Sequence, residues 1–186
     1  MPSVCVFCGS STPINPVFMD AARETGRRIA ELGWTLVYGG ARRGLMGAIA
    51  DAALGAGGRV VGIIPRSLSA REIEHRGLTE LLEVDSLQER KALMAERSDA
   101  FLTLPGGFGT LDELFEVLTW AMLGMHDKPC VVVDTAGYYT HLFAFVDHAL
   151  AEGFVPASFG RHFFTAPDPP KALRCIERQL ATRNCP

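Results

Sequence analysis

The stretch AFLTLPGGFGTLDE, residues 100–113, decides the fold. It begins with the apolar run 100–104, which has the length and composition of a buried strand, and it leads into a segment with helical spacing of apolar residues. Three glycines separate the two, whereas a tight turn needs one or two. A glycine loop before a helix offers unpaired N–H groups and the positive end of the helix dipole to an anion. The stretch therefore predicts a strand, a candidate anion-binding loop and a helix, with a plain turn as the alternative.

Short apolar runs alternate with helical segments along the rest of the chain. Strands are predicted at 4–8, 35–38, 59–65, 81–85, 100–104, 129–134 and 162–166. Apolar strands that are each followed by a helix are typical of a parallel sheet covered on both faces. The sequence therefore predicts an α/β fold, doubly wound and Rossmann-like, with about six or seven mostly parallel strands and helices on both faces. We expect one nucleotide-binding domain over residues 1–186.

Helix boundaries carry their own signals. Asn15 and Pro16 form a start signal for a helix that Gly33 ends. Ser86 and Glu89 have the spacing of a capping box, which predicts a helix from there to about Arg97.

Three strands are followed by glycine-bearing loops, at 8–11, 39–47 and 105–110. Since ligands bind beyond the carboxyl ends of the strands in such sheets, we expect these loops to converge on one site. Both of the longer loops are candidate anion sites. No glycine precedes a lysine, which excludes a Walker A loop. The first loop has a single glycine, so a dinucleotide fingerprint is only weakly supported.

Composition narrows the class of protein. The chain has 186 residues, 48% hydrophobic and 21% charged, with a formal net charge of −3. This balance argues against a nucleic-acid partner, which would favour a basic face. No apolar run approaches the roughly 20 residues of a membrane span, and no basic leader opens the chain. We expect a cytoplasmic protein without a membrane partner.

The five cysteines do not suggest a disulfide framework. Cys5 and Cys8 match C-x-x-C, but residues three apart on a strand point to opposite faces. We therefore expect buried thiols rather than redox chemistry, and the five histidines show no spacing that indicates a metal site.

Charged residues accompany the glycine loops. Arg90 and Lys91 lie near the start of the helix after the fourth predicted strand, and Asp112 and Glu113 open the helix after PGGFGT. An arginine there can bind a phosphate or a sugar in bidentate fashion. Alternatively, Arg90 and Lys91 are ordinary solvated surface charges. Asp112 and Glu113 would then only complement the helix dipole.

These motifs together resemble the LOG family of cytokinin riboside 5'-monophosphate phosphoribohydrolases, whose members are often described as lysine decarboxylases. The matching motifs are P-G-G-x-G-T-x-x-E at 105–113, FCGSS at 7–11, YGG and GLMG within 38–47, IIP at 63–65, RK-x-x-M at 90–94 and LTWAMLGMHDKP at 118–129. Two departures stand out, namely Asp112 where glutamate is common and ARRG after the YGG.

The resemblance implies hydrolysis of the N-glycosidic bond of a cytokinin riboside 5'-monophosphate or of AMP, by a homodimer or larger homo-oligomer without a metal or cofactor. Arg90 and Glu113 would be the catalytic pair. The expected substrate-binding residues are Glu72, Lys91, Gly106, Gly107, Phe108, Gly109, Thr110, Leu111, Asp112 and Thr119. Further phosphate or ribose contacts are expected from Ser10, Gly40, Gly44 and Met46.

The sequence leaves three alternatives to hydrolysis. A non-catalytic nucleotide or cofactor carrier of the same fold is the main alternative, although a carrier would not require the Arg90, Lys91 and Glu113 combination. Pyridoxal phosphate chemistry needs a lysine Schiff base, and of the chain's three lysines only Lys91 is near the expected site. A nicotinamide oxidoreductase is the least favoured.

Overall fold

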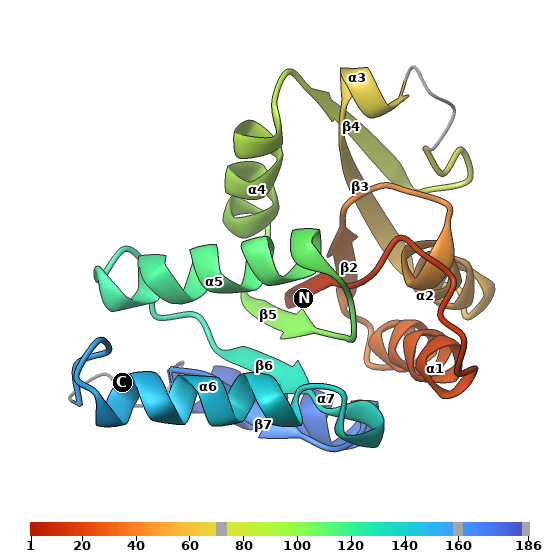
Figure 1. Ribbon diagram of the computed structural model, residues 1–186. Helices are drawn as coiled ribbons and strands as arrows, with labels where there is room; N and C mark the ends of the chain where they lie inside the picture. Colours follow the sequence, from red (N-terminus) through yellow and green to blue (C-terminus); the bar gives the residue numbers. More distant parts are fainter. Residues whose placement is uncertain (70–73, 158–161, 184–186) are drawn as a thin grey trace.

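The computed structural model describes residues 1–69, 74–157 and 162–183. Within them, seven strands form one sheet in which every pair of neighbours is parallel, in the order β4-β3-β2-β1-β5-β6-β7 (Figure 1). The strands are β1 (Ser3–Phe7), β2 (Thr35–Tyr38), β3 (Arg59–Pro65), β4 (Glu80–Val84), β5 (Ala100–Thr103), β6 (Cys130–Val133) and β7 (Phe164–Ala166). The order reverses at β1, which pairs with β2 on one side and β5 on the other. Ligands bind at this kind of switch point.

Helices cover both faces of the sheet, which confirms the predicted fold class. They are α1 (Val17–Glu31), α2 (Gly44–Gly55), α3 (Arg66–Ser69), α4 (Leu87–Glu96), α5 (Phe108–Met122), α6 (Thr140–Ala151) and α7 (Pro169–Arg183), with a 3₁₀ turn η1 (Thr135–Gly137). One apolar core joins α1, α2 and α7 to the sheet, and the other joins α4, α5 and α6 to the opposite face. No helix in the described residues is long and apolar enough to cross a membrane.

Alternation along the strands places the two early cysteines as predicted. Cys5 belongs to the core under α4 and α5, whereas Cys8 belongs to the core under α1 and α2. Both thiols are buried and free, and burial raises the pKa of each. The sulfurs therefore lie on opposite faces of the sheet, and the C-x-x-C spacing reflects strand geometry.

The predicted capping box is present at the start of α4. The Ser86 hydroxyl accepts a hydrogen bond from the Glu89 N–H at 3.0 Å, and the Glu89 carboxylate accepts one from the Asp85 N–H at 2.8 Å. This cap fixes where the helix begins and hence which face Arg90 presents.

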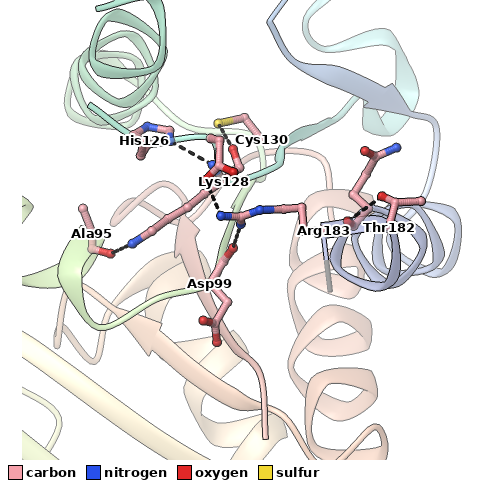
Figure 2. Close-up of polar contacts among 9 residues, drawn as sticks. Ala95, Asp99, His126, Lys128, Cys130, Thr182 and Arg183 are labelled. Atoms are coloured by element: carbon pink, nitrogen blue, oxygen red, sulfur yellow. Dashed lines mark hydrogen bonds and ion pairs between the residues drawn. The ribbon is translucent and has the colours of Figure 1, made fainter. Parts of the chain in front are cut away.

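Polar contacts at the amino end of the sheet join the segments before β5 and β6 to α4 and α7 (Figure 2). The Lys128 ammonium donates to the Ala95 carbonyl at 2.8 Å, and Arg183 donates to the Asp99 carbonyl at 3.4 Å. His126 accepts from the Lys128 N–H and contacts the Val117 carbonyl, so it secures the end of α5 to the following loop. Lys128 is thus held at the edge of the sheet opposite to the strand exits.

Candidate active site

A cavity of about 770 Å³ lies at the carboxyl edge of the sheet. Residues 8–11 after β1, Gly39 and Ala41 after β2, and residues 105–110 after β5 all line it. The three glycine-bearing strand exits therefore meet at one site, beside the point where the strand order reverses.

The loop before α2 is not open to an anion, although its sequence is glycine-rich. The N–H groups of Leu45 and Met46 both donate to the Gly9 carbonyl, at 3.0 and 3.3 Å. Gly44 adopts a positive φ of 57°, and a Cβ there would lie 2.5 Å from the backbone of Ser10. The start of α2 is consequently occupied by the loop that leaves β1.

The loop before α5 is built differently. Added Cβ atoms at Gly107 and Gly109 would meet nothing within 4 Å, and neither residue has a positive φ. Packing and backbone conformation therefore do not require glycine at these two positions. Both residues line the cavity, where the first N–H groups of a 15-residue helix lack partners within the helix.

Gly106 has a separate structural role. A Cβ at this position would lie 2.1 Å from the Thr110 hydroxyl oxygen and 2.9 Å from the Gly9 nitrogen. Only glycine lets the strand exits approach so closely, so this residue shapes the loop that presents the start of α5.

Arg90 and Glu113 form a partly buried ion pair in the wall of the cavity. The distance from Arg90 Nη2 to Glu113 Oε1 is 3.1 Å, and each side chain is 12% exposed. A Cβ at Gly39 would lie 1.8 Å from Arg90 Nη2, so the absence of a side chain there admits the guanidinium. Arg90 Nε is buried without a hydrogen-bond partner in the described residues. An unpaired buried donor is costly, and a ligand oxygen would satisfy it.

The electrostatic state of Glu113 follows from its burial. Burial raises the pKa of this carboxyl from 4.5 to about 7, while Arg90 and Lys91 lower it and Asp112 and Glu116 raise it. The group is therefore divided between its charged and neutral forms near neutral pH, in the range that suits an acid or base catalyst.

Lys91 joins α4 to α5 beside the cavity. Its ammonium lies 2.9 Å from the Asp112 carboxylate and 3.1 Å from the Glu116 carboxylate. Burial lowers the pKa of Lys91, but the hydrogen bonds to Asp112 and Glu116 outweigh it and leave the pKa above its usual value. Lys91 and Asp112 do not line the cavity, and they bind each other across the two helices.

The other expected site residues divide into two groups. Those that line the cavity are Ser10, Met46, Gly106, Gly107, Phe108, Gly109 and Thr110. Gly40, Gly44, Leu111 and Thr119 do not line it. Gly40 packs on β3 with a φ of 73°, Leu111 packs against the core under α5, and the Thr119 hydroxyl donates to the Phe115 carbonyl. Glu72 lies outside the described residues.

The predicted site residues do not include Gly39 and Tyr138, which both line the cavity. The expected contact in the YGG doublet is Gly40, whereas Gly39 is the glycine that lines the cavity. Tyr138 lines the cavity from the segment after β6 and donates its hydroxyl to the Gly106 carbonyl at 2.7 Å. The doublet was a usable signal for Gly39, whereas nothing in the sequence links position 138 to the loop at 106.

Among the residues that the structure describes, no three His, Cys, Asp or Glu side chains are grouped to hold an ion.

Similar solved structures share the fold. A molybdenum cofactor binding protein from Rippkaea orientalis superposes with a TM-score of 0.74 at 21% identity, over 96% of this chain and 97% of the other. The solved structure of TM1055 superposes with a TM-score of 0.73 at 25% identity, over 96% of this chain and 99% of the other.

A protein family described as "Possible lysine decarboxylase" matches residues 46–176. Pyridoxal phosphate chemistry needs a free lysine at the site. Lys91 is bound to Asp112 and Glu116, Lys128 to the Ala95 carbonyl and Lys171 to Asp168, and none of the three lines the cavity. The residues present do not fit a pyridoxal phosphate site.

Curated relatives match nearly the whole chain. A cytokinin riboside 5'-monophosphate phosphoribohydrolase from Rhodococcoides fascians is 52% identical over 161 residues, 86% of this chain and 81% of the relative. A probable enzyme of the same name from Oryza sativa subsp. japonica is 48% identical over 177 residues, 95% and 78%. One from Arabidopsis thaliana is 43% identical over 177 residues, 95% and 83%. The chain belongs to the LOG family of cytokinin riboside 5'-monophosphate phosphoribohydrolases.

Proposed function

We propose that this protein hydrolyses the N-glycosidic bond of cytokinin riboside 5'-monophosphates, of AMP, or of both, and releases the free base and ribose 5-phosphate. The observation that carries the proposal is the partly buried ion pair of Arg90 and Glu113, in the wall of a cavity that also contains the open start of α5. The relatives named as phosphoribohydrolases support the same reaction.

The phosphate binds at the start of α5. The N–H groups there are free of intrahelical partners, the helix dipole favours negative charge, and Gly107 and Gly109 leave room for phosphate oxygens to reach the backbone. Thr110 lies in the first turn and lines the cavity, so its hydroxyl is a further donor. This arrangement selects a 5'-phosphate over an uncharged 5'-hydroxyl.

The reaction takes place beside Glu113. Breaking the bond between ribose C1' and the base nitrogen leaves positive charge on the sugar, and the bonding electrons move onto the base. The ionised Glu113 carboxylate stabilises this charge and accepts a proton from water as the water oxygen bonds to C1'. The departing base takes up a proton, so the overall change consumes one water.

Arg90 has two roles in this scheme. Its charge opposes the effect of burial on the pKa of Glu113 and so favours the carboxylate form. Its unpaired Nε donor binds a ribose or phosphate oxygen of the substrate. Met46 and Ser10 complete the wall of the substrate cavity. Lys91 and Asp112 act from outside the lining by holding α4 against α5.

The surroundings of the site complete the proposal. The whole chain acts as a single nucleotide-binding domain.

Exposed apolar side chains on and just after α5 form a surface that suits a homodimer or a larger homo-oligomer. These side chains are Phe115, Met122, Leu123 and Met125. Free thiols at four cysteines in the described residues fit a reducing compartment, which supports a cytoplasmic location.

Chromatography of the products tests the reaction. The protein is incubated with AMP and, separately, with isopentenyladenosine monophosphate, and free base and ribose 5-phosphate are quantified. We expect equal amounts of both products, and the ratio of the two rates identifies the preferred substrate. Retention of intact nucleotide on the protein without any release of base would contradict hydrolysis and indicate a carrier.

Two substitutions assign the chemistry. Glu113→Gln and Arg90→Ala should each lower turnover by about a hundredfold or more, because a positioned acid or base usually supplies that much. Arg97→Ala is the control, since Arg97 caps the same helix and pairs with Glu80 away from the cavity. Circular dichroism verifies that all three variants are folded. Turnover at the wild-type rate in Glu113→Gln would remove Glu113 from the mechanism.

A further inference from the structure

Three successive carbonyl groups at the end of β5 are each held by a different donor. Leu104 accepts from the Tyr139 hydroxyl at 2.8 Å, Pro105 from the Gly9 N–H at 3.1 Å, and Gly106 from the Tyr138 hydroxyl at 2.7 Å. The Tyr139 side chain is buried and the Gly9 donor is a backbone N–H. Tyr138, in contrast, is 44% exposed and lines the cavity.

The peptide between Gly106 and Gly107 is the part of this loop that most needs a tether. Rotation of a peptide plane changes ψ of the residue before it and φ of the residue after it, and here both residues are glycine. Glycine adopts almost every backbone conformation with little steric cost, so this plane turns more easily than its neighbours. The carbonyl of Gly106 and the N–H of Gly107 point in opposite directions in a trans peptide. Fixing the carbonyl therefore fixes the N–H.

The position of Tyr138 is itself well determined. Ala136 and Gly137 both adopt left-handed conformations, with φ of 54° and 71°, and they turn the chain at the end of β6. The Asp134 carboxylate accepts the Tyr139 N–H at 2.7 Å and secures this turn. The Tyr138 ring packs edge-on against Phe18 and Tyr139, with ring centroids 5.4 and 4.9 Å apart. Left-handed conformations at residues other than glycine concentrate where function requires them.

We propose that Tyr138 is a positioning residue of the phosphate site: its hydroxyl holds the peptide between Gly106 and Gly107 so that the Gly107 N–H faces the bound phosphate. The inference rests on the proposed function, because it assumes a nucleotide phosphate at the start of α5. It adds a residue that lies outside the loop and acts through the loop's backbone.

Tyr138→Phe removes the hydroxyl and keeps the ring. We expect the dissociation constant for AMP to rise about three- to tenfold, the equivalent of one hydrogen bond. Binding of adenosine, which has no phosphate, should be unchanged. The melting temperature should also be unchanged, because water can reach the Gly106 carbonyl beside an exposed side chain.

Tyr139→Phe is the matched control. It removes a hydroxyl from the adjacent tyrosine and a hydrogen bond of nearly the same length, but Tyr139 is 2% exposed and does not line the cavity. Its loss leaves the Leu104 carbonyl buried without this donor and removes a hydroxyl that also interacts with the Gly106 backbone, so the melting temperature should fall and the affinity for AMP should fall less than in Tyr138→Phe.

Calorimetric titration with AMP and adenosine, together with thermal unfolding, decides the matter. Wild-type affinity for AMP in Tyr138→Phe, an equal loss of adenosine binding, or an equal loss of AMP binding in Tyr139→Phe would each overturn the role of Tyr138. Wild-type protein that binds AMP without releasing adenine would overturn the hydrolysis and leave this comparison of affinities intact. Wild-type protein that binds neither AMP nor isopentenyladenosine monophosphate would overturn both.

Discussion

The carboxyl group of Glu113 makes the stability of the fold depend on pH, and Glu113→Gln should remove that dependence. Burial raises the pKa of Glu113 in the folded protein to about 7, above the 4.5 of an ordinary glutamate. The folded state therefore holds this proton more tightly than the unfolded chain does. Between these two pKa values the unfolded chain has lost the proton while the folded protein retains it, so the free energy of unfolding falls as the pH rises.

The size of the effect follows from the two pKa values. One proton contributes about 1.4 kcal/mol for each pH unit in this interval. Between pH 5 and pH 8 the wild-type protein should lose about 2 to 3 kcal/mol relative to Glu113→Gln, with most of the loss below pH 7. Glutamine has nearly the shape of the neutral acid, and its carbonyl oxygen can still accept from Arg90. The variant should thus be the more stable protein above neutral pH, although it is expected to be inactive.

Urea unfolding at pH 5, 6, 7 and 8 measures this difference. Other titrating groups are common to both proteins and cancel when their free energies of unfolding are subtracted. Asp20→Asn, which removes an exposed carboxylate on α1, is the control for the loss of one negative charge. A difference between Glu113→Gln and wild type that stays constant from pH 5 to pH 8 would refute the raised pKa and, with it, the assignment of Glu113 as the titrating catalyst.

Three further results are expected. Gly109→Ala should fold normally and weaken AMP binding by about tenfold, because its Cβ enters space left for phosphate. Gly55→Ala is the control, since a Cβ there also meets no atom but lies on α2, and it should bind AMP like wild type. Unchanged AMP affinity in Gly109→Ala would contradict the assigned phosphate site. The ratio kcat/KM should rise with pH through about 7 as Glu113 ionises, and a profile that falls through this range would assign catalysis to the neutral acid. Lys91→Met should move that rise to higher pH, since Lys91 lowers the pKa of Glu113, and an unmoved profile would show that Lys91 does not act on Glu113.

The fold was predictable because its signals are local. Apolar runs such as 59–65 and caps such as Ser86 with Glu89 each depend on a few neighbouring residues, and the structure confirms both. The opposite orientation of Cys5 and Cys8 followed from the two-residue period of a strand.

The choice between the two glycine loops was not predictable, because it depends on contacts between distant segments. The start of α2 is filled by the Gly9 carbonyl, which comes from the loop after β1. Gly39 and Arg90 lie 51 positions apart, and only their packing explains why the glycine is needed. Tyr138 reaches Gly106 from the segment that follows the neighbouring strand β6, and nothing in the sequence indicates that contact.

A crystal structure of Glu113→Gln with bound AMP tests the central claim most directly, because the substitution should preserve the substrate. We expect the phosphate to accept hydrogen bonds from the backbone at 107–109 and ribose C1' to lie beside the side chain at position 113. A phosphate bound at the start of α2, or a ribose turned away from position 113, would contradict both the phosphate site and the chemistry assigned to Glu113.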